Sequence, residues 1–252
     1  MANERLRDAL LKAGLTPAAL ADHVGVNAKT AERWITMDRP PYPRHRHSIA
    51  ALLRERESYL WPSALPEQRS VKVAESELVH VYPRRSAVPT EVWRRLVEQA
   101  EERISILVYA GLFLPEIEPR LIRLMRRKAE SGASVQLLLG DPESATVAQR
   151  GAEEGIGDAM ASKVRNVLSF YNQLQGVPNV EARFHSTTLY NSIYRFDDDM
   201  LVNTHAYGFP AAHAPVLHLR ELSGGDLFGT YADSFDRVWS GGQPVWGSAV
   251  AG

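Results

Sequence analysis

The first sixty residues alternate apolar and polar positions at the spacing of short amphipathic helices. Within Leu15–Trp34, Thr16 followed by Pro17 is a typical helix start, and Gly25 stands where a left-handed residue would end that helix. Asn27 is suited to begin the next helix. The inward-facing positions are Ala18, Leu20, Ala21, Val24, Ala31, Trp34 and Ile35. The pattern therefore predicts two short helices joined by a tight glycine turn.

Two further helices and a basic segment flank this pair. Apolar spacing predicts one helix over Asn3–Ala13 and another from Ser48 to about Glu57, with the basic segment Arg39–His47 preceding the latter. Residues 1–57 hold 10 Lys and Arg against 7 Asp and Glu, whereas the remaining 195 residues hold 19 against 23. Positive charge is therefore concentrated at the helical end of the chain.

Two helices joined in this way form the motif that places its second helix in the major groove of DNA. Lys29, Thr30 and Arg33 remain on the outer face of the second helix, where they suit base edges and phosphates. The expected DNA contacts are Asn27, Lys29, Thr30 and Arg33, with Arg39, Arg44 and Arg46 on the phosphate backbone. The alternative interpretation is a helical hairpin that serves only as part of a larger core.

The N-terminal quarter of the chain resembles the phage-repressor (Xre/Cro) class of regulators. Its last part, PRHRHSIAALLRERESYLWP, is similar to versions common in actinobacterial regulators. The resemblance implies an operator in double-stranded DNA as the partner. A single helix-turn-helix reads about half a site, so we also expect a homodimer.

A different pattern follows the two prolines Pro62 and Pro66, which break the helical region. Strands are predicted at Leu78–Tyr82, Ile104–Tyr109, Val135–Gly140, Val180–His185, Leu189–Phe196, Met200–His205 and Val216–Arg220. Helices are predicted at Glu91–Arg103, Pro115–Ser131, Ser144–Leu174, with a break at Gly155–Gly157, and Asp226–Trp239. This order indicates a mixed α/β sheet covered on both faces, and an α+β chain overall.

The expected domain organisation has four parts. Residues 1–60 form the DNA-binding domain, 61–77 a linker, 78–240 the sheet domain and 241–252 a C-terminal tail. The helical part and the sheet part each contain enough apolar residues for a core, since 44% of the chain is hydrophobic.

The stretch LYNSIYRFDDDMLVNTHAYG reads as a hairpin with an acidic turn. With the strands and helices before it, it resembles the phospholipase D-like superfamily, whose signature on such a hairpin is His-x-Lys-x4-Asp. Here Tyr190 occupies the His position, Ser192 the Lys position and Asp197 the Asp position. Tyrosine and serine replace neither the histidine nucleophile nor the cation, so we expect no catalytic residues and no enzyme activity. The resemblance also implies pairing of two chains through residues beyond Leu78.

Polar side chains on this hairpin instead suit the binding of a small polar or aromatic effector. The expected ligand-binding residues are Tyr190, Ser192, Asn203, His205 and Tyr207. The alternative is a cleft filled by its own side chains, in a domain that only dimerises. Asp197, Asp198 and Asp199 are interpreted as a solvated turn rather than a metal site, and Lys163 and Arg165 as surface charges.

Composition narrows the remaining classes. The chain has no cysteine, which excludes disulfides, thiolate metal sites and a cysteine nucleophile. It has no apolar run of membrane-spanning length and no secretory leader, so a cytoplasmic protein without a metal or cofactor is expected. The leading hypothesis is a transcriptional regulator with a catalytically silent second domain. The alternatives are a phosphodiesterase or nuclease that is targeted to DNA and a module that docks a protein partner.

Overall fold

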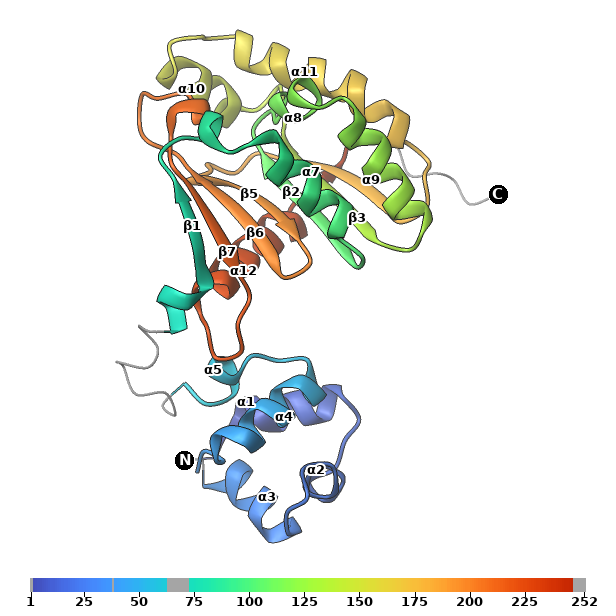
Figure 1. Ribbon diagram of the computed structural model, residues 1–252, viewed down its shortest axis with the longest axis vertical. Coiled ribbons are helices and arrows are strands. Elements are labelled where there is room, and N and C mark those ends of the chain that lie inside the picture. The colour runs from blue at the N-terminus through green and yellow to red at the C-terminus, as the bar shows by residue number, and fades with distance from the viewer. Residues whose placement is uncertain (1, 38, 63–72, 247–252) are drawn as a thin grey trace. The chain divides into compact units, whose positions relative to one another are not determined.

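The computed structural model describes residues 2–37, 39–62 and 73–246 (Figure 1). The chain divides into two compact units. The first, called the helical unit here, comprises Met1–Glu77 together with Leu222–Asp226, and the second, the sheet unit, comprises Leu78–Glu221 and Leu227–Gly252. Most of the expected linker, at 63–72, and the last part of the expected tail, at 247–252, lie outside the described residues.

The described part of the helical unit contains five short helices that carry element labels in Figure 1. They are α1 (Glu4–Lys12), α2 (Pro17–Val24), α3 (Ala28–Thr36), α4 (Pro43–Leu53) and α5 (Glu57–Leu60). Their inward faces share one apolar core, in which Leu6, Leu20, Ile49, Leu60 and Trp61 are almost completely buried. Burial of these side chains is the main favourable term for so small a unit.

The predicted turn between α2 and α3 is confirmed in detail. The Thr16 hydroxyl accepts a hydrogen bond from the Ala19 amide at 3.2 Å and caps α2. Gly25 has a φ of +70°, the left-handed conformation that glycine adopts without a steric penalty. The Asn27 side chain accepts from the Lys29 amide at 2.9 Å and begins α3. These contacts fix a helix-turn-helix.

Helix α4 begins earlier than the sequence pattern indicated. It starts at Pro43, five residues before Ser48, because proline is favoured in the first turn of a helix, where its missing amide is not needed. The second half of the basic segment is therefore helical, and the helix ends at Leu53, followed by the separate turn of α5.

The sheet unit contains one sheet of eight strands, in the order β1-β7-β6-β5-β2-β3-β4-β8. Strands β2, β3 and β4 are parallel, and the other neighbours are antiparallel. The strands are β1 (Leu78–Tyr82), β2 (Arg103–Val108), β3 (Ser134–Gly140), β4 (Val180–His185), β5 (Asn191–Phe196), β6 (Asp199–Thr204), β7 (Val216–Arg220) and β8 (Gln243–Pro244). The predicted mixed sheet is confirmed, and it extends through β8 into the segment expected to be a tail.

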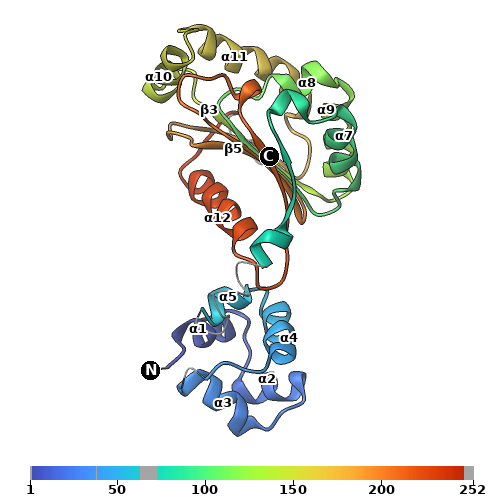
Figure 2. The same cartoon turned by 60° about the vertical axis from the view of Figure 1, so that its left-hand side comes forward.

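Helices cover both faces of the sheet, as Figure 2 shows for α12 on one side and α7 and α9 on the other. Two apolar clusters lie between these layers, one containing Trp93, Met125 and Leu137, and the other containing Leu138 and Phe235. The helices are α7 (Thr90–Gln99), α8 (Phe113–Ile117), α9 (Arg120–Glu130), α10 (Ala145–Glu153), α11 (Ala159–Tyr171) and α12 (Leu227–Ser240), with short 3-10 turns η1 (Arg85–Ala87), η2 (Asn172–Leu174) and η3 (Ala211–His213). The α+β class is confirmed.

The helices expected at Pro115–Ser131 and Ser144–Leu174 are each divided. The first becomes α8 and α9, and the second becomes α10, α11 and η2. The break predicted at Gly155–Gly157 is confirmed, because both glycines have positive φ angles, +70° and +49°, which a continuing α-helix cannot accommodate.

The acidic turn between β5 and β6 corrects one expectation. Asp197 has a φ of +50°, and its carboxylate accepts hydrogen bonds from the backbone amides of Glu101, Glu102 and Arg103 at 2.7, 3.0 and 2.6 Å. It is therefore a structural anchor for the start of β2 rather than a merely solvated turn residue.

Candidate functional site

A groove of about 540 Å³ lies beside the second helix of the helix-turn-helix. Its lining includes five of the seven expected DNA contacts, which come from α3, from the segment after it and from the first turn of α4. These are Asn27, Thr30, Arg33, Arg39 and Arg44. Val26, Trp34, Tyr42 and His45 complete the lining. The fold thus gathers on one surface side chains that are up to 17 positions apart in the chain.

The charge of this groove is positive. Arg33, Arg39 and Arg44 are exposed, and none of them forms an ion pair with another described residue. Tyr42 stands 79% exposed beside them. Exposed, unpaired guanidinium groups beside the outer face of α3 provide donors for phosphate oxygens and for base edges.

Lys29 and Arg46 do not line the groove. Lys29 is exposed elsewhere on α3, so it remains available to solvent. Arg46 is buried, and its guanidinium lies 3.3 Å from the Glu57 carboxylate and donates to the Pro41 carbonyl at 3.1 Å. The expected backbone contact from Arg46 is therefore corrected, because this side chain holds α4 to α5 and has almost no exposed surface.

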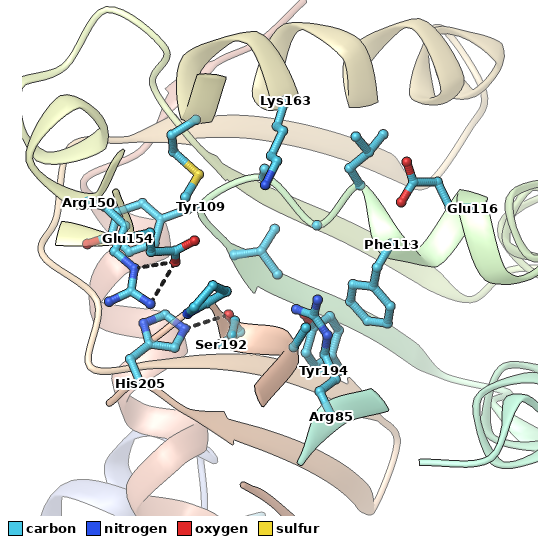
Figure 3. A pocket seen from close by; sticks show the side chains of 18 residues that line it. Arg85, Tyr109, Phe113, Glu116, Arg150, Glu154, Lys163, Ser192, Tyr194 and His205 are labelled. Atoms are coloured by element: carbon cyan, nitrogen blue, oxygen red, sulfur yellow. Dashed lines mark hydrogen bonds and ion pairs between the residues drawn. The ribbon is translucent and has the colours of Figure 1, made fainter. Parts of the chain in front are cut away.

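A second cavity, of about 200 Å³, lies in the sheet unit (Figure 3). It opens where β1, β2 and β6 end and β5 begins, so loops after three strands converge on it. Helix α10 contributes Arg150, and α11 contributes Met160 and Lys163. This end of a sheet, with helices on its sides, is a common location for ligand sites in α/β folds.

Ser192 and His205 face each other on the floor of this cavity. The Ser192 hydroxyl lies 3.0 Å from His205 Nε2, and His205 Nδ1 lies 3.2 Å from the Leu189 carbonyl. Because a carbonyl only accepts, Nδ1 carries the proton and the Ser192 hydroxyl donates to Nε2. Burial and the nearby Arg150 guanidinium lower the pKa of His205 to about 4. The imidazole is therefore neutral at pH 7.

Arg150 forms a buried ion pair at one side of the cavity. Its guanidinium lies 2.7 Å from the Glu154 carboxylate, and the two side chains are only 5% and 6% exposed. It also donates to the Phe209 carbonyl at 2.9 Å, so it ties α10 to the loop after β6. Most of its charge is balanced by Glu154.

Arg85 and Lys163 enter the cavity from opposite sides, as Figure 3 shows. The Arg85 guanidinium lies over the Phe113 ring, 3.9 Å from its centroid, and neither cation forms an ion pair with another described residue. The Tyr194 side chain beside Arg85 is fully buried, and its hydroxyl has no hydrogen-bond partner among the described residues. Burial raises the pKa of Tyr194, although Arg85 opposes the rise.

Only part of the expected ligand-binding set meets here. Ser192 and His205 line the cavity, whereas Tyr190 and Tyr207 are each 81% exposed and do not line it. Asn203 is fully buried, and its amide donates to the carbonyls of Ala214 and Pro215, so its assignment is corrected to a structural one. Sequence reasoning missed Arg85, Tyr109, Phe113, Glu116, Arg150, Glu154, Lys163 and Tyr194.

Metal-binding clusters and membrane-spanning helices are both absent from the part of the chain that the structure describes. No group of three or more His, Asp or Glu side chains in residues 2–37, 39–62 and 73–246 is arranged to hold a metal ion. Within the same ranges, no helix combines the length and apolar character needed to cross a membrane.

Comparison with known proteins gives distant similarities in structure alone. No family model matches the chain, and no curated protein matches its sequence. The chain is similar to TrmBL2, an archaeal chromatin protein reported to show a novel mode of DNA binding, with a TM-score of 0.41 and 13% identity over 79% of this chain. It spans 61% of the length of that structure. It is also similar to Nuc, a phospholipase D family member from Salmonella typhimurium, with a TM-score of 0.39 and 11% identity, covering 66% of this chain and 95% of that one.

Proposed function

We propose that this protein is a sequence-specific, DNA-binding transcriptional regulator whose sheet unit binds a small effector without catalysing a reaction. The observation that carries the proposal is the groove beside α3, where Arg33, Arg39 and Arg44 are exposed without ion pairs next to a capped helix-turn-helix. The Xre/Cro-type resemblance of this segment supports the same conclusion. Base contacts then come from Thr30 and Arg33, and phosphate contacts from Arg39 and Arg44.

The protein acts as a homodimer in this proposal. One helix-turn-helix with a single outer face reads a half-site, so a two-fold partner supplies the rest of the affinity and matches a palindromic operator. Light scattering of the full chain tests the pairing, and the proposal predicts twice the 28.1 kDa chain mass at micromolar concentration. A monomer under those conditions, both in the free protein and in its complex with the operator DNA identified as described below, would contradict the homodimer.

The environment of His205 supports the proposal that the sheet unit is catalytically silent. Accepting a proton from Ser192 would create an imidazolium, which is disfavoured because burial and the Arg150 guanidinium lower the pKa of His205 to about 4. We therefore do not expect Ser192 to act as an activated nucleophile, and Tyr190, at the position of the histidine in the phospholipase D-like motif, is exposed to solvent. Bis(p-nitrophenyl) phosphate and DNA should both remain intact. Turnover that disappears in His205→Ala would instead support the phosphodiesterase alternative.

Selection of DNA fragments from a random pool, followed by mobility shifts, tests the regulatory proposal directly. We expect an enriched palindromic sequence, and Arg33→Ala should weaken its binding by about 1–3 kcal/mol and relax the preference at one position of each half-site. Arg7→Ala is a matched control, because Arg7 is exposed on α1 and pairs with Glu4. No enrichment, or equal effects of the two substitutions, would contradict DNA reading by α3.

A further inference from the structure

We propose that the cavity of the sheet unit binds a small organic monocarboxylate, with its carboxylate between Arg85 and Lys163 and its apolar part against Phe113 and Val108. This inference deepens the effector-binding role proposed above and rests on it. Three separate observations support the assignment of a monocarboxylate. They are the charges of the lining, a hydroxyl without a hydrogen-bond partner and the dimensions of the cavity.

The first observation is the charge of the cavity. Its lining holds three cationic side chains, Arg85, Arg150 and Lys163, and two carboxylates, Glu116 and Glu154. Arg150 and Glu154 pair with each other, and His205 is neutral, which leaves one net positive charge. A ligand with a single negative charge balances this lining, whereas a cation would be repelled by two unpaired cationic groups.

The second observation is the hydroxyl of Tyr194. It is fully buried in the wall of the cavity and finds no acceptor among the described residues. Ser192 and Arg85 lie close enough to lower the pKa of Tyr194, but neither forms a hydrogen bond of normal geometry with its hydroxyl. Buried donors without partners are rare in proteins and are costly, so a ligand oxygen beside Arg85 is the natural acceptor.

The third observation concerns size and polarity. At about 200 Å³ the cavity is smaller than the roughly 300–1,000 Å³ of sites for drug-sized ligands. Val108, Phe113 and Met160 give it an apolar surface beside the charged groups. A short aliphatic or single-ring acid fits both properties.

The carboxylates of the lining select against a more highly charged ligand. Glu116 reaches the cavity from α8, near Phe113, and forms no ion pair with another described residue (Figure 3). A phosphate monoester carries nearly two negative charges at neutral pH and would meet this carboxylate with only one net positive charge to balance it. A carboxylic acid is therefore favoured over its phosphate analogue.

Thermal shift and isothermal titration of the full-length protein test this assignment. The probes are acetate, butyrate, benzoate and phenylacetate, each compared with its neutral amide, together with phenyl phosphate and benzylamine. We expect at least one carboxylate to raise the Tm and to bind at least tenfold more tightly than its amide, phenyl phosphate and benzylamine. If no carboxylate binds better than its amide, or if phenyl phosphate binds best, the assignment is wrong.

Variants locate the binding and separate it from stability. Lys163→Gln and Arg85→Gln should each weaken the best carboxylate about tenfold, whereas Arg165→Gln, on the same helix but outside the cavity, should not. Tyr194→Phe should weaken it about fivefold and leave the Tm of the free protein unchanged or higher, because the removed hydroxyl has no partner.

Equal affinity in Lys163→Gln and Arg165→Gln would overturn the site, as would unchanged affinity in Tyr194→Phe. These measurements contain no DNA, so their failure is distinct from a failure of the proposed regulator. An enriched operator with a normal Arg33→Ala effect, alongside no carboxylate binding, would reject only the ligand assignment. A carboxylate that binds as expected in a protein without operator preference would reject only the DNA-binding proposal.

Discussion

The helical unit and the sheet unit use arginine in opposite ways. In the groove beside α3, Arg33, Arg39 and Arg44 are exposed and form no ion pair with another described residue. In the cavity of the sheet unit, Arg150 is buried against Glu154, and Arg85 lies over the Phe113 ring. The first arrangement suits a polyanion, and the second suits one small ligand of defined charge.

This difference follows from the dielectric environment of each group. Exposed guanidinium groups remain hydrated, so their contribution to binding comes mainly from phosphate neutralisation and the release of counterions, and it depends strongly on salt. Charges in a low-dielectric cavity interact more strongly, and each must be balanced nearby. Substitutions should therefore affect DNA affinity in one unit and stability or ligand affinity in the other.

Removal of the buried guanidinium should produce the largest effect. Arg150→Met leaves the Glu154 carboxylate buried without its partner, and we expect a loss of about 3–5 kcal/mol in unfolding free energy. Urea unfolding followed by circular dichroism measures it. Arg165→Met removes an exposed pair with Glu143 and should cost under about 1 kcal/mol. Similar losses of unfolding free energy in the two variants would contradict the proposed difference between buried and exposed arginines.

The second effect appears as pH dependence of stability. His205 has a pKa of about 4 in the folded protein, well below its ordinary value of 6.5. As pH falls from 6.5 towards 4, the unfolded chain takes up a proton that the folded one does not, so stability is lost and then levels off below pH 4. This site should account for a loss on the order of 3 kcal/mol, which urea titrations at several pH values detect.

The variant that isolates the pH effect is His205→Gln, which should not show the loss of about 3 kcal/mol in unfolding free energy that is due to His205. His23→Gln, at an exposed position on α2, should keep it. If His205→Gln and the unmodified protein lose equal stability between pH 6.5 and 4, the claim that burial and Arg150 lower the pKa of His205 is wrong.

The smallest expected effect concerns the exposed arginines in the groove beside α3. If Arg44 contacts one phosphate as proposed, Arg44→Gln should decrease the magnitude of the slope of log affinity against log salt concentration by about 0.9. Fluorescence anisotropy with the selected operator over a salt series measures this slope. Arg54→Gln removes an equal charge from an exposed position outside the groove and should leave the slope nearly unchanged. An identical slope in all three proteins would show that Arg44 does not contact the phosphate backbone.

The same contrast explains what sequence reasoning found and missed. Periodicity and capping located α2 and α3 because their information is local, and Val180–His185 and Val216–Arg220 were predicted with the bounds of β4 and β7. The cavity was harder to predict, because its residues come from seven elements and the loops beside them and carry no shared spacing. Arg85 lies between the predicted strand Leu78–Tyr82 and the helix predicted from Glu91, and Lys163 was interpreted as an ordinary surface charge.

The error at Arg46 has a specific geometrical cause. With a helix expected only from Ser48, the preceding basic residues appeared to form an exposed segment. Because α4 begins at Pro43, Arg46 shares a helical face with the buried Ile49, Ala50 and Leu53, at spacings of three, four and seven residues. A five-residue shift of one helix start thus turned a predicted DNA contact into a structural ion pair.

The helical unit is built from two separate stretches of the chain, Met1–Glu77 and Leu222–Asp226, and this affects how it forms during synthesis on the ribosome. Ser223, from the later stretch, donates to the buried Glu57 carboxylate at 2.8 Å and lies 2.9 Å from His47 Nδ1. At about 5–20 residues per second, more than 160 residues must be added after Glu57 before Ser223 emerges, which takes on the order of 10–30 s. The growing chain therefore holds the helices of the helical unit with an incomplete set of contacts until Ser223 has been synthesised.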